Sequence, residues 1–388
     1  MGLDSKLSLF ADSSPGEILC KAIDSPTTQS VGPSIEKLLF RAFETVPLPM
    51  QKPRVLPRVL IVSPALANAN NGNWQTAWRW SRMLGAEFNV EIAQHWDGSP
   101  NDVMLALHAR RSADSIGLWA ESKGCAADAP GLAVVLTGTD LYRDIRSDAL
   151  AQRSLALAQK LVVLQELGIQ SLQPAHRGKA QCIFQSTSTR QTRLKPNSHL
   201  RALMVGHLRD EKSPQTLFAA AGLLKEHPDI LIDHIGEPLD AELAEQARAT
   251  AQICPNYRWL GGLAHEATRR RIQAAHLLIH ASKMEGGAHV VMEAVCSGTP
   301  VLASRIEGNV GMLGADYPGY FELENAGDLT DLLVKIRHEQ AQAQALSNSH
   351  ESQLFITQLQ AHCAKRAPLF SPAAEQAALI MLVQSLLV

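Results

Sequence analysis

Short apolar runs of strand length recur along the chain from Arg58 onward, separated by segments with helical periodicity. A first series of predicted strands covers residues 59–62, 90–93, 103–107, 133–136, 161–164 and 182–184, and a second covers 202–205, 230–235, 257–260, 277–279 and 301–303. Segments such as 74–84 and 148–159 are predicted helices, and the chain after Asp328 is expected to be wholly helical. Strands that alternate with helices favour parallel, doubly wound sheets, so we predict an α/β protein with two Rossmann-like domains.

The polar segment 185–198, rich in Ser, Thr, Gln and Arg, is the predicted join between the two domains. We therefore expect a first domain over residues 54–197, a second over 198–348, and C-terminal helices over 349–388 that pack back toward the first domain. Residues 1–53 do not fit this plan and are expected to form a poorly ordered N-terminal extension. A second interpretation of this extension is that Met50 is the true start of the protein.

Composition excludes several classes of protein. The 388 residues are 46% hydrophobic, enough for a large core. A net charge of -2 and a pI near 6.7 give no reason to expect nucleic acid or an acidic membrane as partner. No apolar run reaches the length of a membrane span, and no signal peptide is recognisable, so we expect a cytoplasmic protein. The six cysteines lack any Cys-x-x-Cys pair, which favours reduced thiols over zinc or disulfides.

Two glutamates eight positions apart, Glu285 and Glu293, are the strongest chemical signal. Glu285 follows the predicted strand 277–279 and precedes Gly286 and Gly287, whereas Glu293 lies on the predicted helix that comes next. An acidic side chain on a loop that opens a helix can bind hydroxyls, while free backbone N–H groups beside it hold phosphate. A nucleotide-sugar presents both kinds of group.

Two further loops of the second domain favour binding of a phosphorylated ligand. Arg209 and Lys212 follow the strand 202–205, at the sheet edge where open α/β folds bind ligands, and could neutralise a diphosphate leaving group. The alternative is a solvated charged turn. The predicted loop 307–314 contains three glycines that would let backbone N–H groups approach an anion, and its alternative is a flexible turn. The candidates in these two segments are His207, Arg209, Lys212, Gly308, Asn309, Gly311 and Leu313.

In the first domain, candidate acceptor residues follow the predicted strands 59–62, 103–107 and 133–136. The spacing after the first strand is not Gly-x-Gly-x-x-Gly, so a nicotinamide cofactor is a poor match. Two arginines beside a histidine would make an anion pocket, or one arginine could pair with Asp114 while the other is solvated. Trp74 and Trp78 are expected to pack in the core. The candidates are Asn71, Gly72, Asn73, Arg79, His108, Arg110, Arg111, Thr137 and Thr139.

The segment from Glu285 to Glu293 resembles the E-x7-E motif of retaining GT-B glycosyltransferases, with Gly286 after the first glutamate and Gly298-Thr299-Pro300 after the helix. This resemblance implies two Rossmann-like domains facing across a cleft. It also implies that Glu293 binds ribose, that Glu285 binds the donor sugar, and that the strand-end cations bind pyrophosphate. Lys212 matches the family directly. His207 stands where the family has arginine, so Arg209 is assigned in its place, and Gly287 replaces the usual aromatic residue.

Strings over residues 71–77, 108–115, 136–142, 206–214 and 307–314 are similar to the selenosugar synthase family of selenoneine biosynthesis. The similarity spans about residues 54–339. It implies transfer of a sugar, preferentially N-acetylglucosamine, from a UDP-sugar to selenophosphate, with release of UDP and phosphate. It also implies functional coupling to a selenophosphate synthetase and a selenoneine synthase. No Asp-x-Asp motif stands in a suitable loop, so we expect neither a metal nor another cofactor.

The nature of the acceptor separates the competing hypotheses. A hydroxyl acceptor normally benefits from a general base, and the sequence offers no convincing carboxylate base in the first domain. Selenophosphate arrives already anionic and needs cations to position it. The alternatives are a GT-B glycosyltransferase that acts on a hydroxyl, and a catalytically silent module that binds nucleotide-sugars.

Overall fold

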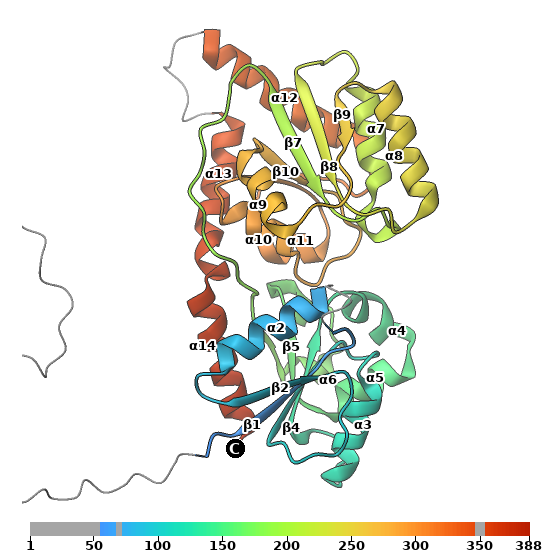
Figure 1. The fold of residues 1–388 in the computed structure, drawn as a ribbon, viewed down its shortest axis with the longest axis vertical. Helices are drawn as coiled ribbons and strands as arrows, with labels where there is room; N and C mark the ends of the chain where they lie inside the picture. The colour runs from blue at the N-terminus through green and yellow to red at the C-terminus, as the bar shows by residue number, and fades with distance from the viewer. Residues whose placement is uncertain (1–54, 67–71, 346–353) are drawn as a thin grey trace, which may run out of the picture. The chain divides into compact units, whose positions relative to one another are not determined.

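The computed structural model describes residues 55–66, 72–345 and 354–388, and residues from Leu56 to Val388 form one compact unit (Figure 1). The predicted N-terminal extension, the alternative start at Met50 and the candidate Asn71 lie outside the described residues.

The first domain is built on a six-stranded parallel sheet with the order β2-β1-β3-β4-β5-β6. Its strands are β1 (Arg58–Val62), β2 (Asn89–Ala93), β3 (Val103–Leu107), β4 (Ala129–Leu136), β5 (Ala158–Val163) and β6 (Ala180–Cys182). Its helices are α2 (Gly72–Leu84), α3 (Ala113–Ser122), α4 (Ile145–Ser147), α5 (Ala149–Leu157) and α6 (Pro174–Arg177). Val59 pairs with Val90 on one side and Val103 on the other, so apolar strand residues fill the sheet centre.

The second domain is built on another six-stranded parallel sheet, with the order β12-β11-β10-β7-β8-β9. Its strands are β7 (Leu200–Val205), β8 (Ile230–Ile235), β9 (Tyr257–Trp259), β10 (Leu277–His280), β11 (Val301–Ser304) and β12 (Tyr320–Phe321). Its helices are α7 (Pro214–Leu223), α8 (Ala241–Ile253), α9 (His265–Ala274), α10 (His289–Val295), α11 (Glu307–Leu313) and α12 (Ala326–Ala345). The predicted α/β class with two parallel sheets is therefore confirmed.

The last two helices pack on different sheets. Leu359 of α13 (Phe355–Arg366) is buried in the core of the second domain. Leu379 and Val383 of α14 (Pro372–Leu386) are buried against the first sheet together with Trp80. Figure 1 shows α14 running beside α2. The described chain therefore crosses from the first domain to the second before β7, and it crosses back between α13 and α14.

Three local predictions differ from the structure. The strand expected at 182–184 is β6, two residues earlier. Trp78 was expected in the core but is 47% exposed, whereas Trp80 is fully buried. The indole Nε1 of Trp80 donates a hydrogen bond to Glu375 of α14 (2.6 Å), so the packing of α14 determines which face of α2 is inside. The glycine-rich loop expected at 307–314 is the helix α11.

Candidate active site

The carboxyl ends of β7 and β10 form the point of the second sheet where the strand order reverses. These strands are neighbours, and the chain continues from them toward opposite edges of the sheet. Right-handed crossovers then place the following helices on opposite faces, which leaves a crevice between the two strand-end loops. The predicted donor residues Lys212 and Glu285 lie in these two loops.

Lys212, His280 and Glu285 form a compact charged group at this point. The Lys212 ammonium makes an ion pair with Glu285, and His280 Nε2 lies 3.3 Å from the same carboxylate oxygen. Burial alone would raise the pKa of the Glu285 carboxyl, but the charge of Lys212 and the imidazole of His280 outweigh it and lower that pKa. Glu285 is therefore held ionised, with its acceptor oxygens ready for donor groups.

Glu293 lies on α10 and is nearly buried. Its Oε1 accepts a hydrogen bond from His265 Nε2 (2.6 Å) and lies 3.7 Å from Arg269 Nη1. The hydrogen bond to Glu293 raises the pKa of His265. A hydroxyl ligand of Glu293 would therefore compete with a largely exposed histidine. No pattern in the sequence marked His265 and Arg269, because the helix that carries them has the composition of an ordinary charged surface.

The remaining donor candidates have different surroundings. Arg209 is exposed beside Lys212. His207 is exposed as well, and its Nδ1 accepts a hydrogen bond from the backbone N–H of Glu237 (3.1 Å). Burial, followed by the charges of Arg209 and Lys212, lowers the pKa of His207. Arg209 is therefore better suited than His207 to supply a permanent charge at this edge.

The segment expected to cradle phosphate as a glycine-rich loop is folded differently. In α11, a Cβ on Gly308 would lie 2.1 Å from the Glu285 carbonyl oxygen, and one on Gly311 would lie 1.6 Å from Gln165 Oε1. Asn309 is buried and donates to the Ser304 carbonyl (2.9 Å), and Leu313 is buried too. The glycines therefore let the helix pack closely on the Glu285 loop and on the first domain. The prediction of a loop at 307–314 was wrong, because these glycines allow close packing of a helix; their role as anion ligands stays a prediction.

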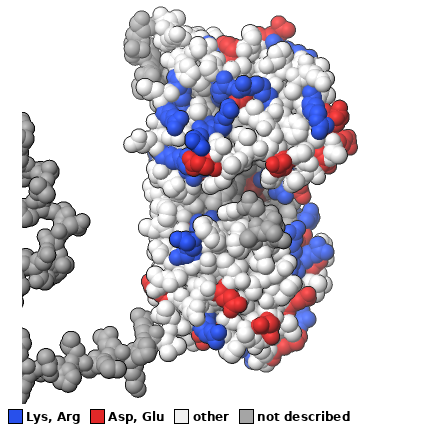
Figure 2. All heavy atoms as spheres, in the orientation of Figure 1, with Lys and Arg blue, Asp and Glu red and all other residues white. Residues whose placement is uncertain are grey.

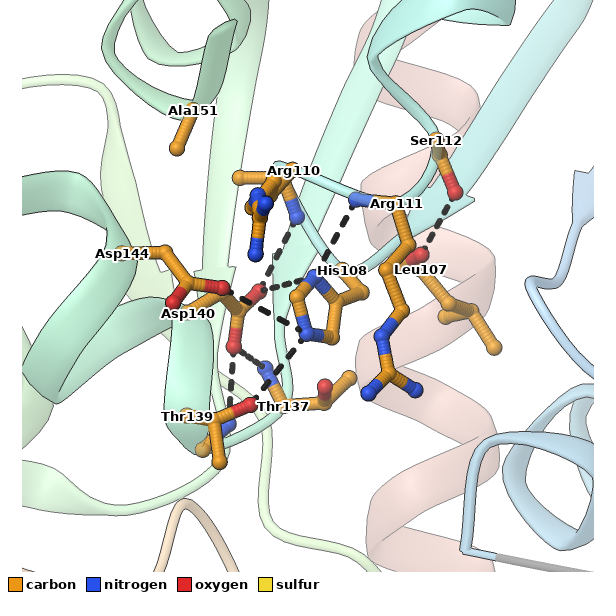
Figure 3. Close-up of polar contacts among 12 residues, drawn as sticks. Leu107, His108, Arg110, Arg111, Ser112, Thr137, Thr139, Asp140, Asp144 and Ala151 are labelled. Carbon is orange, nitrogen blue, oxygen red and sulfur yellow. Dashed lines mark hydrogen bonds and ion pairs between the residues drawn. The ribbon is translucent and has the colours of Figure 1, made fainter. Parts of the chain in front are cut away.

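His108 is the first residue after β3 and the centre of the acceptor candidates (Figure 3). It is buried in the left-handed backbone region, with φ of 74°, which is strained for a residue with a side chain. Its Nδ1 accepts a hydrogen bond from Arg111 N–H (3.3 Å), so Nε2 carries the hydrogen toward Thr139 Oγ1 at 3.2 Å. Burial lowers the pKa of His108, against the opposing effect of nearby carboxylates. His108 is thus a neutral donor in this structure.

Two carboxylates lie beside His108, in the domain where the sequence offered no convincing carboxylate base. Asp140 accepts hydrogen bonds from the backbone N–H groups of Ala109 (3.0 Å) and of Thr137 and Gly138 (2.9 Å each). Asp144 lies 3.8 Å from His108 Nε2 and 3.2 Å from Arg143 Nε. Both carboxylates therefore already have partners. The clue in the sequence was the string Thr-Gly-Thr-Asp, because an Asp side chain often accepts from backbone N–H groups close by.

The two arginines after His108 have different roles. Arg110 Nε makes an exposed ion pair with Asp148 (2.8 Å), not with Asp114, which was the alternative considered from the sequence. Arg111 is exposed, and Figure 3 shows it on the opposite side of the His108 ring from Arg110. Arg111 is therefore the better placed of the two to meet a ligand near His108.

Arg79 was expected to bind the acceptor but is held by other side chains. Its Nε makes an ion pair with the buried Glu375 (3.0 Å), and its Nη1 lies 2.8 Å from His289 Nε2. Glu375 also accepts from Ser186 Oγ (2.5 Å). Burial and the charge of Arg79 lower the pKa of His289 to about 3, so His289 stays neutral. Arg79 therefore joins α2 to α14 and α10, and Glu375 adds the linker to this network.

The donor and acceptor loops touch each other at Gly286. A Cβ on Gly286 would lie 2.4 Å from the Thr137 carbonyl oxygen, and one on Gly287 would lie 2.8 Å from Leu164 Cβ. Side chains larger than hydrogen would separate the loops here. The structure thus brings Glu285 and the Thr137–Thr139 turn together. Gly72 and Asn73 begin α2 after the same edge of the first sheet.

Within the described residues, no group of three or more His, Cys, Asp or Glu side chains is placed to hold a metal ion. In the same part of the chain, no single helix has both the length and the apolar composition to span a membrane. The helix pair Phe355–Phe370 and Pro372–Leu386, bent by 41°, meets those criteria only when taken together.

Comparison with known proteins agrees with this architecture. Residues 185–353 match the family Glycosyl transferases group 1. Among solved structures, the sucrose-phosphate synthase of Thermosynechococcus elongatus superposes with a TM-score of 0.64 at 16% identity over 85% of this chain and 99% of that one. HepE of Anabaena, in complex with UDP-glucose, superposes with a TM-score of 0.61 at 13% identity over 84% and 99%.

A third similar structure is S. aureus TarM, solved with UDP and alpha-GlcNAc-glycerol. Its TM-score is 0.52 at 13% identity over 74% of this chain, which spans 55% of the length of TarM. No curated protein sequence matches the chain. The family match covers residues 185–353, and the likeness to these solved structures shows that the two sheets have the GT-B fold.

Proposed function

We propose that the protein transfers a sugar, N-acetylglucosamine, from a UDP-sugar to selenophosphate. A carbon–selenium bond forms as UDP leaves, and water then cleaves the phosphorus–selenium bond to release phosphate. The single observation that carries the donor half is the ion pair of Lys212 and Glu285 beside His280, where the second sheet reverses its strand order. A selenophosphate synthetase would supply the acceptor, and a selenoneine synthase would consume the product.

The donor site supports this proposal through paired charges. Lys212 and Arg209 would neutralise the diphosphate as it leaves, and charge placed where it develops is typically a large part of catalysis. Glu285 would accept hydrogen bonds from sugar hydroxyls, and Glu293 would bind the ribose after displacing His265. HepE and TarM, which share the fold, were solved with UDP-glucose and with UDP.

The acceptor half is supported by two of the strings that are similar to selenosugar synthases. Residues 108–115 and 136–142 meet where His108 Nε2 faces Thr139 Oγ1. Donors and cations gather there, including Arg111. Of the two carboxylates, Asp140 is already bonded to three backbone N–H groups and Asp144 pairs with Arg143. An acceptor that arrives as an anion needs such groups and needs no proton removed.

The second candidate function is transfer to a hydroxyl acceptor. The observation that favours it is the separation of 3.8 Å between Asp144 Oδ2 and His108 Nε2. A carboxylate beside an imidazole can help it accept a proton from a hydroxyl. In this structure the lone pair of His108 faces Arg111 N–H, so this function requires the imidazole to change its partners.

The deciding experiment incubates the protein with UDP-N-acetylglucosamine and selenophosphate and follows products by mass spectrometry. We expect a seleno-sugar, with one UDP and one phosphate released per turnover. Parallel reactions contain thiophosphate, phosphate or glycerol. UDP release that does not depend on selenophosphate would contradict the proposal, and a glycosylated glycerol would favour the second candidate. Addition of EDTA should leave the rate unchanged, because we propose that no divalent metal takes part.

A matched pair of variants tests the acceptor site. Arg111→Gln should raise the apparent KM for selenophosphate by about tenfold or more, since a charged hydrogen bond is worth roughly 1.5–3 kcal/mol. Arg153→Gln removes the same charge from an exposed position of the same domain, where Arg153 faces Glu121 at 3.7 Å, and should have no effect. Equal KM values in both variants would exclude Arg111 from the acceptor site.

A further inference from the structure

Three arginines surround one buried aspartate on the second sheet, away from the donor loops. Asp233 of β8 accepts hydrogen bonds from Arg201 Nη1 (3.1 Å) and Arg258 Nε (2.8 Å), and Arg271 Nη1 lies 3.9 Å from it. Arg201 is the second residue of β7, whereas the donor loops follow the last residues of β7 and β10. The cluster therefore lies toward the opposite edge of the sheet from the donor site.

The charge of this cluster is not balanced. Three guanidinium groups against one carboxylate leave a local net charge of +2, in a chain whose total charge is -2. One arginine would be enough to neutralise Asp233. The side chains of Arg258 and Arg271 are 51% and 50% exposed, so their free N–H groups can still reach a ligand. Each guanidinium carries five N–H donors. In the whole cluster, one donor of Arg201 and two donors of Arg258 form hydrogen bonds to Asp233.

A cavity of about 260 Å³ opens beside the cluster. It is lined by Arg201, Asp233 and Arg271 together with His199, His276 and Pro196. Figure 2 shows Lys and Arg side chains gathered on this domain. The cavity is large enough for a phosphate-sized anion with some of its water, since a water molecule in the liquid occupies about 30 Å³.

The histidines of the cavity shape its wall without adding charge. Burial lowers the pKa of His276 to about 4, so it is neutral near pH 7. Its Nδ1 accepts from Arg201 N–H (2.9 Å), so Nε2 donates to the Pro196 carbonyl (2.8 Å). Burial, then Arg201 and Arg337, also lower the pKa of His199. The positive charge therefore comes from arginines, whose planar donors suit the oxygens of phosphate.

We propose that the cavity beside Asp233 binds a phosphate group, either as inorganic phosphate or as part of a small phosphorylated metabolite. Arg201 and Arg271, the two arginines of the cavity wall, hold the anion, and Asp233 keeps Arg201 and Arg258 in position. Pro196, at the end of the linker, is part of the cavity wall, so a bound anion lies against the segment that joins the domains. This site is independent of the proposed reaction at Glu285.

The test measures phosphate binding to the full chain by calorimetry, and repeats the measurement with Lys212→Met, which removes a cation of the donor site and leaves the cavity unchanged. Arg201→Gln combined with Arg271→Gln should weaken phosphate binding by at least about tenfold, given the strength of charged hydrogen bonds, while Asp233 keeps Arg258 as its partner. Arg248→Gln is the matched control, because Arg248 is an exposed arginine of the same domain that pairs with Glu245. It should bind phosphate like the unmodified protein. Thermal unfolding of each variant without phosphate shows that it is folded.

Two further arms distinguish the sources of the phosphate group. Competition by UMP or glucose 6-phosphate at lower concentration than inorganic phosphate would assign the cavity to a phosphorylated metabolite, and tighter binding of inorganic phosphate would assign it to the free ion. Affinity that is unchanged in the folded double variant would overturn the proposal. The same loss of affinity in Arg248→Gln would overturn it as well, since it would indicate a general effect of charge.

Discussion

The two strand-end regions that meet at Gly286 differ in where their charges find partners. In the second domain, Lys212, His280 and Glu285 come from one sheet and pair with one another. In the first domain, Arg79 and Arg110 pair away from the acceptor turn, with Glu375 and Asp148. A donor site made by one domain keeps its charges in place without its neighbour. Among the acceptor candidates, by contrast, Arg79 is held by Glu375 of the C-terminal helix and Arg110 by Asp148.

The largest expected effect tests the donor side of this comparison. Lys212→Met should reduce the rate of UDP release by about 10²–10³-fold, as does loss of one group that stabilises developing charge. Lys283→Met is the control, because Lys283 belongs to the loop after β10 but pairs with Asp210 (2.8 Å) and Glu324 (2.7 Å). Equal losses in the two variants would mean that the loop tolerates no change of charge. That result would contradict a specific role for Lys212 in the departure of UDP.

The next effect concerns stability and tests whether Arg79 is structural. Glu375→Ala leaves Arg79 without its buried carboxylate and removes the acceptor of Ser186, which should cost about 3–5 kcal/mol of unfolding free energy. Arg110→Ala breaks the exposed pair with Asp148 and should cost less than about 1 kcal/mol. Urea unfolding measures both. Similar values for the two variants would remove the distinction between these arginines.

A smaller effect links donor binding to pH through His265. The hydrogen bond to Glu293 raises the pKa of His265, so the charged pair persists below that pKa and is lost as pH rises through it. If the ribose takes the place of His265, donor affinity should increase with pH above 6.5, by at most about tenfold per unit for one released proton. His265→Gln should bind with a flatter pH profile. Arg269, 3.7 Å from Glu293, keeps its charge throughout this range. An equally steep profile in the variant would assign the titration to another group.

The smallest effect separates the two tryptophans of α2. Trp78→Ser changes a half-exposed side chain and should alter the free energy of unfolding by about 0.5 kcal/mol or less. Trp80→Ala empties a buried site and removes a hydrogen bond to Glu375, at a cost of about 3–5 kcal/mol. Urea unfolding again checks both values. A large loss in the Trp78 variant would contradict the assignment of this side chain to the surface of α2.

The predictions that held depend on short stretches of sequence. Alternation of apolar runs and helical segments was enough for the two parallel sheets, because buried strands must be apolar. The placement of Lys212 and Glu285 at one sheet edge followed from their positions directly after strands. The role of each residue as a ligand of the donor stays a prediction.

The predictions that failed involve partners far apart in the chain. Arg79 and Glu375 are separated by 296 positions, and no local pattern around Arg79 marks the pairing. The helix α11 was mistaken for a loop because Gly308 and Gly311 serve close approach to Glu285 and Gln165. The role of Asp140 was not predicted. Its carboxylate accepts hydrogen bonds from the turn after β3 and from the turn after β4, and so links the two turns. Such roles depend on three-dimensional contacts that composition and spacing do not encode.

The linker before β7 has a consequence for motion. Arg269 donates to Thr187 and to the Ser188 carbonyl (2.8 Å), and Gln273 donates to the Gln191 carbonyl (2.5 Å), so this stretch is fastened to α9. The second crossing of the chain lies beside it, since Thr187 N–H donates to the Phe370 carbonyl (3.2 Å). The two segments that connect the domains are therefore hydrogen-bonded to each other at one place. Because the two crossings are adjacent, we expect any movement of one sheet relative to the other to be a rotation about this place.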